Sequence, residues 1–289
     1  FNSTSGARQL IYNITPMVAS GLLVEGNRAD ANGGGLYNEG DSTVTNSTIR
    51  GNIAEGGGGL FATGSNTVTL SGTTINANRA VGGGAVSGRS GVTINITNST
   101  LSGNLARDVG AGFYHNGPAS LNFATIANNI SGADSDSAGS GINTFPSGSV
   151  LIAVKNVLLA DNKKGWTYTL DEDYRDTSIP IPLPDDVAFA FQDANCGGTG
   201  GATNILSNGF NLSSDATCTA DVLIQGTDIN NVDPALGVLA NNGGPTFTHA
   251  LAAGSPALSA GAADATVSTD QRGVTRETPP DIGAFELVT

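Results

Sequence analysis

The residues that most often carry enzymatic chemistry are few in this 289-residue chain. Its two histidines, His115 and His249, stand in contexts typical of turn or packing residues. The sequence has no Gly-x-Ser-x-Gly elbow and no recognisable pairing of Cys with His, so nucleophilic catalysis has no candidate. Hydrolysis of a glycosidic bond needs two carboxylates that face one bond across a groove, and no such pair stands out. We therefore predict no catalytic residue.

A second chemistry to consider is calcium binding by acidic side chains. Four carboxylates follow repeated asparagines by three to five positions: Asp30, Glu55, Asp108 and Asp134. Clustered carboxylate oxygens of this kind bind Ca²⁺. The same turns also carry the basic residues Arg28, Arg79, Arg107 and Lys163, which favours a solvated stripe of mixed charge. Ca²⁺ is therefore the only cofactor that we consider, with Asp108, Asp134 and Asp136 as its candidate ligands.

The two cysteines, Cys196 and Cys218, enclose a loop rich in Gly and Ser. A disulfide that closes a loop of this length stabilises a fold by about 3 kcal/mol. We predict this disulfide, and with it an oxidising compartment. The alternative is a pair of buried thiols in a cytosolic protein.

The strongest signal in the sequence is a repeat of about 25 residues. In each unit an aliphatic residue is followed three positions later by Asn, then by Ala or Ser, and then by a glycine cluster. The repeated asparagines are Asn27, Asn52, Asn78, Asn104, Asn129 and Asn162. Identical amides one coil apart can form a hydrogen-bonded ladder that also caps turn carbonyls. The glycine clusters are expected at corners where backbones approach closely.

The elements that must position these residues are short strands. Residues 43–45, 67–70 and 92–96 alternate apolar and polar side chains, and no helical period of useful length appears. A unit this small buries its apolar face only by stacking on its neighbours. Parallel crossovers are nearly always right-handed. The sequence therefore predicts an all-β fold, a right-handed parallel β-helix with coils of about 25 residues.

We expect one elongated domain in four parts. These are an N-terminal edge strand or cap (1–20), regular coils (21–165), a surface excursion (166–195), and C-terminal coils with a cap and the disulfide loop (196–289). The strand-like residues Leu10, Ile11, Tyr12 and Ile14 precede the first clear repeat. This segment either covers its own first coil or adds to the sheet edge of another subunit.

Charge and hydropathy narrow the partners. The formal net charge of −13 would repel a nucleic-acid backbone, so we expect no nucleic-acid partner. No apolar stretch approaches the roughly 20 residues that span a bilayer, so we expect no membrane-spanning segment. The chain opens at Phe1 without an initiator Met or a leader, which suggests an exported, processed product.

The C-terminal third contains a set of recognisable motifs: Ser207–Leu212, Asp233–Leu239, Asn241–Thr246, Gly254–Ala257, Asp270–Gly273 and Asp281–Glu286. Together they closely resemble the choice-of-anchor Q type of bacterial surface protein. The preceding repeats are similar to those of polymorphic outer-membrane and autotransporter-like passengers. The resemblance implies a parallel β-helix that is exported or held at the cell surface of a bacterium, without a settled activity.

Two functions remain open at this stage. The first is a structural or adhesive surface protein whose subunits stack through their coil ends into a filament, with surface glycans as further partners. The second is a pectate-lyase-like, polysaccharide-active enzyme or a glycan-binding module. In that version, Trp166, Tyr168 and Tyr174 of the excursion would stack on sugar rings. We find no regular row of exposed aromatic residues in the repeats, which counts against sugar binding.

Overall fold

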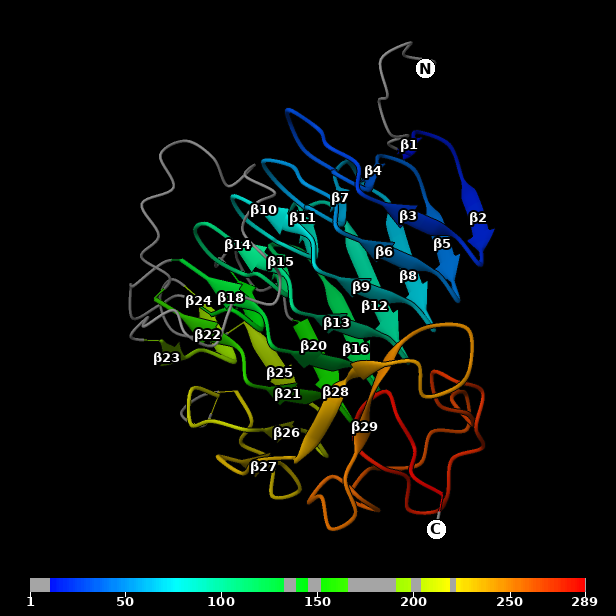
Figure 1. Cartoon of the computed structure of the whole chain (residues 1–289), viewed down its shortest axis with the longest axis vertical. Helices are drawn as coiled ribbons and strands as arrows, with labels where there is room; N and C mark the ends of the chain where they lie inside the picture. The colour runs from blue at the N-terminus through cyan, green and yellow to red at the C-terminus, as the bar shows by residue number, and fades with distance from the viewer. Residues whose placement is uncertain are drawn as a thin grey trace.

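The computed structural model describes residues 11–132, 139–144, 152–165, 191–198, 204–218 and 222–288. None of these residues is helical, and nearly all strands belong to sheets that run coil upon coil along one axis (Figure 1). The repeated asparagines of the first regular coils lie 25 or 26 positions apart, and equivalent positions of sheet A lie 24 to 27 apart. The predicted all-β, parallel β-helix with coils of about 25 residues is confirmed.

Each coil contributes one strand to sheet A and one to sheet B. Sheet A contains β1 (Ile11–Asn13), β4 (Leu36–Asn38), β7 (Leu60–Ala62), β11 (Val86–Gly88), β15 (Phe113–His115), β19 (Ile142–Thr144) and β24 (Cys196–Gly198). Sheet B contains β2 (Met17–Ser20), β5 (Ser42–Thr45), β8 (Thr67–Ser71), β12 (Thr93–Thr97), β16 (Ala119–Asn122), β20 (Ile152–Lys155) and β25 (Ile205–Ser207). All neighbouring strands in these two sheets are parallel.

Two further sheets complete the coil. Sheet C contains β3 (Leu23–Glu25), β6 (Thr48–Arg50), β9 (Thr74–Asn76), β13 (Thr100–Ser102), β17 (Thr125–Ala127), β21 (Leu158–Ala160), β26 (Leu212–Ser213) and β27 (Ile229–Asn230). Sheet D contains β10 (Arg79–Ala80), β14 (Leu105–Ala106), β18 (Ile130–Ser131), β22 (Lys163–Lys164) and β23 (Gln192–Asp193), the last of which pairs antiparallel with β22.

The hydrophobic core is a narrow column inside the coils. In sheet B, for example, Val44, Leu70 and Ile96 occupy one register and are fully buried. The residues on either side of each of them along its strand face outward. Strands in neighbouring coils lie about 4.8 Å apart, so aliphatic side chains of one row touch along the axis. Continuous packing of this kind explains why the unit repeats so regularly.

The glycine clusters allow the backbone to pass close to its neighbours at the corner before sheet A. A Cβ atom on Gly59 would lie 2.6 Å from the Ala85 carbonyl oxygen and 2.7 Å from Ile75 Cγ2. Gly57 has a φ of +60°, in the left-handed region. A side chain at these positions would clash or strain the chain, because L-residues rarely adopt this geometry.

The C-terminal segment, residues 234–288, folds back along the outer face of sheet C (Figure 1). It includes the antiparallel hairpin of β28 (Leu236–Ala240) and β29 (Thr248–Leu251). Thr74 Oγ1 donates to the Phe247 carbonyl oxygen, and Thr100 Oγ1 donates to Gln271 Oε1. These outward-pointing threonines are fully buried as a result.

The expected parts of the chain map onto the structure as follows. β1 and β2 lie within the expected cap (1–20) and pair with β4 and β5 in the same parallel order as later coils. Residues 166–190 of the expected excursion, with Trp166, Tyr168 and Tyr174, lie outside the described residues. The segment 196–289 supplies the last coils and the segment that covers sheet C.

Candidate functional site

The six repeated asparagines lie in one buried row at the corner after sheet C, where each is between 0% and 3% exposed. Asn52 is typical of the row. Its Nδ2 donates to Asn78 Oδ1 (2.9 Å) and to the Val24 carbonyl oxygen (3.0 Å). Its Oδ1 accepts from the backbone N–H and the Nδ2 of Asn27, both at 2.9 Å. Every hydrogen-bonding position of this amide is occupied, so the amide has no group left for a ligand.

The row continues beyond the six residues that the sequence pattern identified. Asn162 Nδ2 donates to Asn195 Oδ1 (2.8 Å), and the backbone N–H of Asn195 donates to Asp215 Oδ2 (3.1 Å). Asn195 was missed because Gln192 stands where the pattern requires an aliphatic residue. The spacing itself was a usable signal, since Asn195 follows Asn162 by 33 positions, the same step that separates Asn129 from Asn162.

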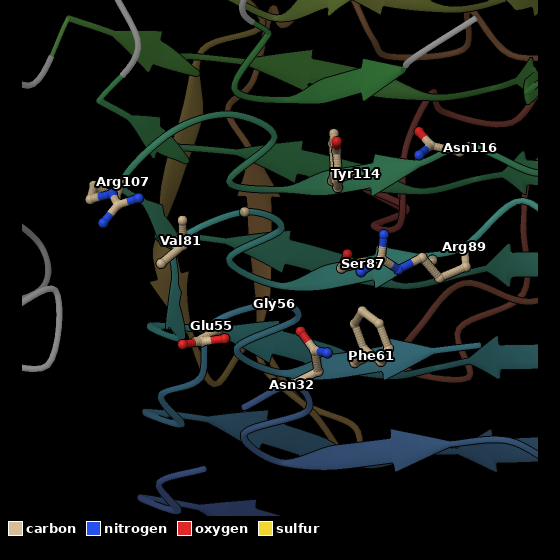
Figure 2. Close-up of a pocket in the computed structure, with 12 residues that line it drawn as sticks. Asn32, Glu55, Gly56, Phe61, Val81, Ser87, Arg89, Arg107, Tyr114 and Asn116 are labelled. Carbon is tan, nitrogen blue, oxygen red and sulfur yellow. The ribbon is translucent and has the colours of Figure 1, made fainter. Parts of the chain in front are cut away.

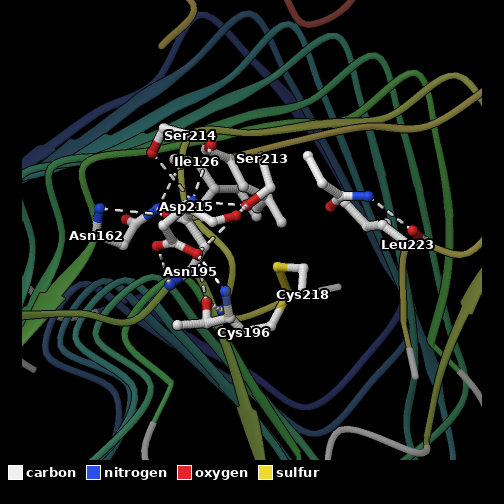
Figure 3. Close-up of a disulfide and its surroundings, with 12 residues drawn as sticks. Ile126, Asn162, Asn195, Cys196, Ser213, Ser214, Asp215, Cys218 and Leu223 are labelled. Carbon is white, nitrogen blue, oxygen red and sulfur yellow. Dashed lines mark hydrogen bonds between the residues drawn. A yellow bond between two sulfur atoms is a disulfide. The ribbon is translucent and has the colours of Figure 1, made fainter. Parts of the chain in front are cut away.

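The predicted disulfide between Cys196 and Cys218 is confirmed. It lies at the C-terminal end of the coil stack, next to Asp215 and the last rungs of the asparagine row (Figure 3). Cys218 is buried in the same core cluster as Val222 and Leu223. The bridge thus fastens the segment that covers this end of the core.

Both histidines are buried. Burial lowers the pKa of His115 and of His249 below the ordinary value of 6.5. His249 Nδ1 lies 2.7 Å from the Gly237 carbonyl oxygen and therefore donates to it, so that Nε2 accepts from the Ser102 hydroxyl at 2.8 Å. His249 thus joins the β28–β29 hairpin to sheet C as a neutral ring.

Of the three candidate calcium ligands, Asp108 alone lies among the described residues. Asp108 forms an ion pair with Arg107 at 3.0 Å on the surface. Asp134 and Asp136 lie outside the described residues. Within the described part of the chain, no group of three or more His, Cys, Asp or Glu side chains could hold a metal ion.

The repeats carry one short aromatic row, in which Tyr12 is exposed and Phe61 is buried. Tyr12, Tyr37 and Phe61 occupy one register on the outer face of sheet A. The Tyr12 and Tyr37 rings stack with centroids 4.9 Å apart and planes 7° apart, and the Tyr37 and Phe61 centroids are 5.5 Å apart. Each of these residues directly follows an aliphatic residue (Ile11, Leu36, Leu60). This aliphatic–aromatic pair was a usable sequence signal, but it is not part of the repeated asparagine pattern. The row is solvent-accessible at Tyr12, which is 55% exposed, and covered at Phe61.

A cavity of about 610 Å³ opens where this row is interrupted. The next two positions of the register are Ser87 and Tyr114. Arg89, at the turn after β11, places its guanidinium carbon 5.5 Å from the centroid of the Phe61 ring. Figure 2 shows Phe61, Ser87 and Tyr114 on successive rungs, with Arg89 and Asn116 on one side. Burial raises the pKa of Tyr114, and the nearby Arg89 charge opposes that increase.

The N-terminal coil presents open sheet edges. Among the described residues, β1, β2 and β3 pair only with the next coil and have no strand on their outer side. Ile11, Met17 and Leu22 pack against the core but stay partly exposed, whereas Leu36, the register partner of Ile11, is fully buried. Of the candidate strand-addition residues, Ile11 and Tyr12 lie in β1, Ile14 follows it and is 61% exposed, and Leu10 lies outside the described residues.

No protein-family model, curated protein or solved structure matches this chain. Among the described residues, no helix has the length and apolar character needed to cross a membrane. Function is therefore inferred from the geometry of the chain itself.

Proposed function

We propose that this chain is a structural or adhesive β-helix protein of a bacterial cell surface, and that copies join end to end into a filament through the N-terminal coil. The observation that carries the proposal is that, within the described residues, no strand pairs with the outer edges of β1, β2 and β3. The resemblance of the C-terminal motifs to choice-of-anchor Q surface proteins supports the location. The Cys196–Cys218 disulfide supports it too, because such bridges persist in oxidising compartments.

Open edges of this kind attract further strands. Unpaired N–H and C=O groups form a ready template for another chain, and natural proteins usually cover them. Here the template comes with apolar surface: Val18 is 85% exposed and Leu23 is 58% exposed. Adding a coil would also bury the partly exposed core residues Ile11, Met17 and Leu22.

A second copy of this chain is the occupant that fits. The exposed edges of sheets A, B and C belong to one coil. A partner that pairs with all three in parallel must itself present three strands arranged as in such a coil. At the opposite end, β25 and β27 are the last described strands of sheets B and C, and an added coil would pair with them beside the segment that the disulfide fastens. Because the two ends differ, the contact is head to tail, and repeating it builds an open filament rather than a closed dimer.

The test uses the hydrogen-bond directions of β2. Met17 N–H donates to the Asp41 carbonyl oxygen and Gly21 N–H donates to the Thr45 carbonyl oxygen. In a parallel sheet, the backbone N–H groups of successive residues point alternately to the strand on one side and the strand on the other. The N–H of Val18 therefore points to the open edge. Proline is tolerated at such an edge position but cannot donate to an added strand.

We expect Val18→Pro to fold as the wild type does and to lose self-association in light scattering and in a sizing column. Val18→Thr is the matched control, because it removes the exposed apolar side chain and keeps the N–H. Equal assembly of Val18→Pro and wild type would refute strand addition at this edge, as would a wild-type chain that stays monomeric at high concentration.

A further inference from the structure

The cavity beside Ser87 interrupts an otherwise continuous stack. Tyr12, Tyr37 and Phe61 succeed one another at 4.9 Å and 5.5 Å, and Tyr114 resumes the register two strands after Phe61. Adjacent strands are about 4.8 Å apart, so the Phe61 and Tyr114 strands are separated by about 10 Å. The small Ser87 side chain leaves a slot between these two rings, and the Arg89 guanidinium enters it over the Phe61 ring, which is only 3% exposed.

Arg89 brings a positive charge to this slot. Its guanidinium carbon lies 5.5 Å from the Phe61 centroid, the same separation as between Tyr37 and Phe61, so the cation takes the place of the missing ring. Its charge also acts on the hydroxyl groups of Tyr37 and Tyr114 and favours their ionised forms. Arg89 is exposed to solvent and belongs to a chain with only 12 Lys and Arg residues and a net charge of −13. A cation on this surface is therefore a specific local feature.

The rest of the lining is polar and mixed in character. Asn32 and Asn116 offer amide donors and acceptors, and Glu55 offers a carboxylate. Arg107 also lines the cavity, but it forms an ion pair with Asp108. Aromatic faces combined with a few placed polar groups are typical of small-molecule sites. Sugars match such a lining because their C–H faces pack on rings and each hydroxyl both donates and accepts.

We propose that this cavity binds one ring of a uronate-bearing saccharide. The sugar ring packs against Tyr114, its carboxylate pairs with the Arg89 guanidinium that covers Phe61, and its hydroxyls meet the amides of Asn116 and Asn32. Arg matches a carboxylate with two parallel hydrogen bonds, which Lys cannot do. The site serves binding and not hydrolysis, because Glu55 is the one carboxylate among the described residues of the lining and glycosidases require two.

The test measures binding of hexagalacturonate and of the neutral cellohexaose by calorimetry on the wild-type chain. We expect hexagalacturonate to bind at least tenfold more tightly than cellohexaose. Arg89→Gln should weaken hexagalacturonate binding at least tenfold, and Arg89→Lys should restore only part of it. Arg50→Gln is the matched control: it removes the same charge from a surface ion pair with Glu25, outside this cavity, and should leave affinity unchanged.

A second variant tests the slot without removing a charge. Ser87→Phe fills the slot and displaces the Arg89 guanidinium from it, and should abolish binding while circular dichroism shows that the coils still fold. The proposal fails if the wild type does not bind hexagalacturonate, or if cellohexaose binds equally well. It also fails if Arg89→Gln and Arg50→Gln lose affinity to the same extent, or if Ser87→Phe binds as the wild type does.

Discussion

Replacing Asn78 by alanine removes four hydrogen bonds from the middle of the asparagine row. Its Nδ2 donates to the Ile49 carbonyl oxygen and to Asn104 Oδ1, both at 3.0 Å. Its Oδ1 accepts from the backbone N–H and the Nδ2 of Asn52 at 3.0 and 2.9 Å. Asn78 is fully buried, so the groups it leaves behind sit away from bulk solvent.

The size of the effect follows from these contacts. A buried hydrogen bond contributes about 0.5–1.5 kcal/mol net, so four of them amount to about 2–6 kcal/mol. We expect Asn78→Ala to lower the free energy of unfolding by about 3 kcal/mol, with water entering the vacated space and satisfying part of what is lost. For a chain of this length that corresponds to a melting temperature about 6 °C lower.

The matched control is Asn27→Ala at the first rung. The Asn27 side chain is also buried, yet it donates one hydrogen bond to the row, to Asn52 Oδ1. We expect this variant to cost about 1 kcal/mol. Urea and thermal unfolding followed by circular dichroism measure both. If Asn78→Ala is no more destabilised than Asn27→Ala, the row does not stabilise the coils in the way that its geometry implies.

Two further predictions concern the ends of the coil stack and the sheet C cover. Replacing both Cys196 and Cys218 by serine should lower the free energy of unfolding by about 3 kcal/mol, since the bridge closes a loop with a sequence separation of 22; an unchanged urea midpoint would contradict this. Burial lowers the pKa of His249, so as the pH falls the unfolded chain protonates this ring before the folded chain does. The stability that the neutral ring contributes is therefore complete above pH 6.5 and is lost as the pH falls below it. Relative to His249→Gln, the wild type should therefore lose stability as the pH falls below 6.5, as urea unfolding at each pH would show; parallel pH profiles would refute this.

The coils were predictable because their signal is local and repeated. An asparagine that recurs every 25 or 26 residues marks the coil length directly, and the flanking aliphatic residues mark the face that turns inward. The disulfide was predictable for a similar reason, since the chain has only two cysteines and they flank one short loop.

The cover on sheet C could not be predicted from local pattern. Thr74, Thr100 and Thr125 alternate with buried aliphatic residues and therefore appear to face solvent, but the C-terminal segment buries them through contacts up to 197 residues away in sequence. The motifs of that segment hold it together and pack it on the coils. Arg276 forms a buried ion pair with Glu286 at 3.1 Å, and its guanidinium carbon lies 3.8 Å from the centroid of the Phe123 ring.

The candidate sugar site could not be predicted from the sequence, because its residues do not follow the spacing of the repeated asparagines. The aromatic row uses the outward positions of sheet A, is broken at Ser87, and is completed by a turn residue, Arg89. Only the register of β7, β11 and β15 shows that Phe61, Ser87 and Tyr114 are successive rungs.

The most direct measurement of the central claim is negative-stain electron microscopy of the wild-type chain, with a sizing run of the same sample. We predict regular filaments one β-helix wide, which disappear in Val18→Pro and persist in Val18→Thr. Discrete rods the length of one subunit, for the wild type and for both variants, would contradict end-to-end assembly through the N-terminal coil.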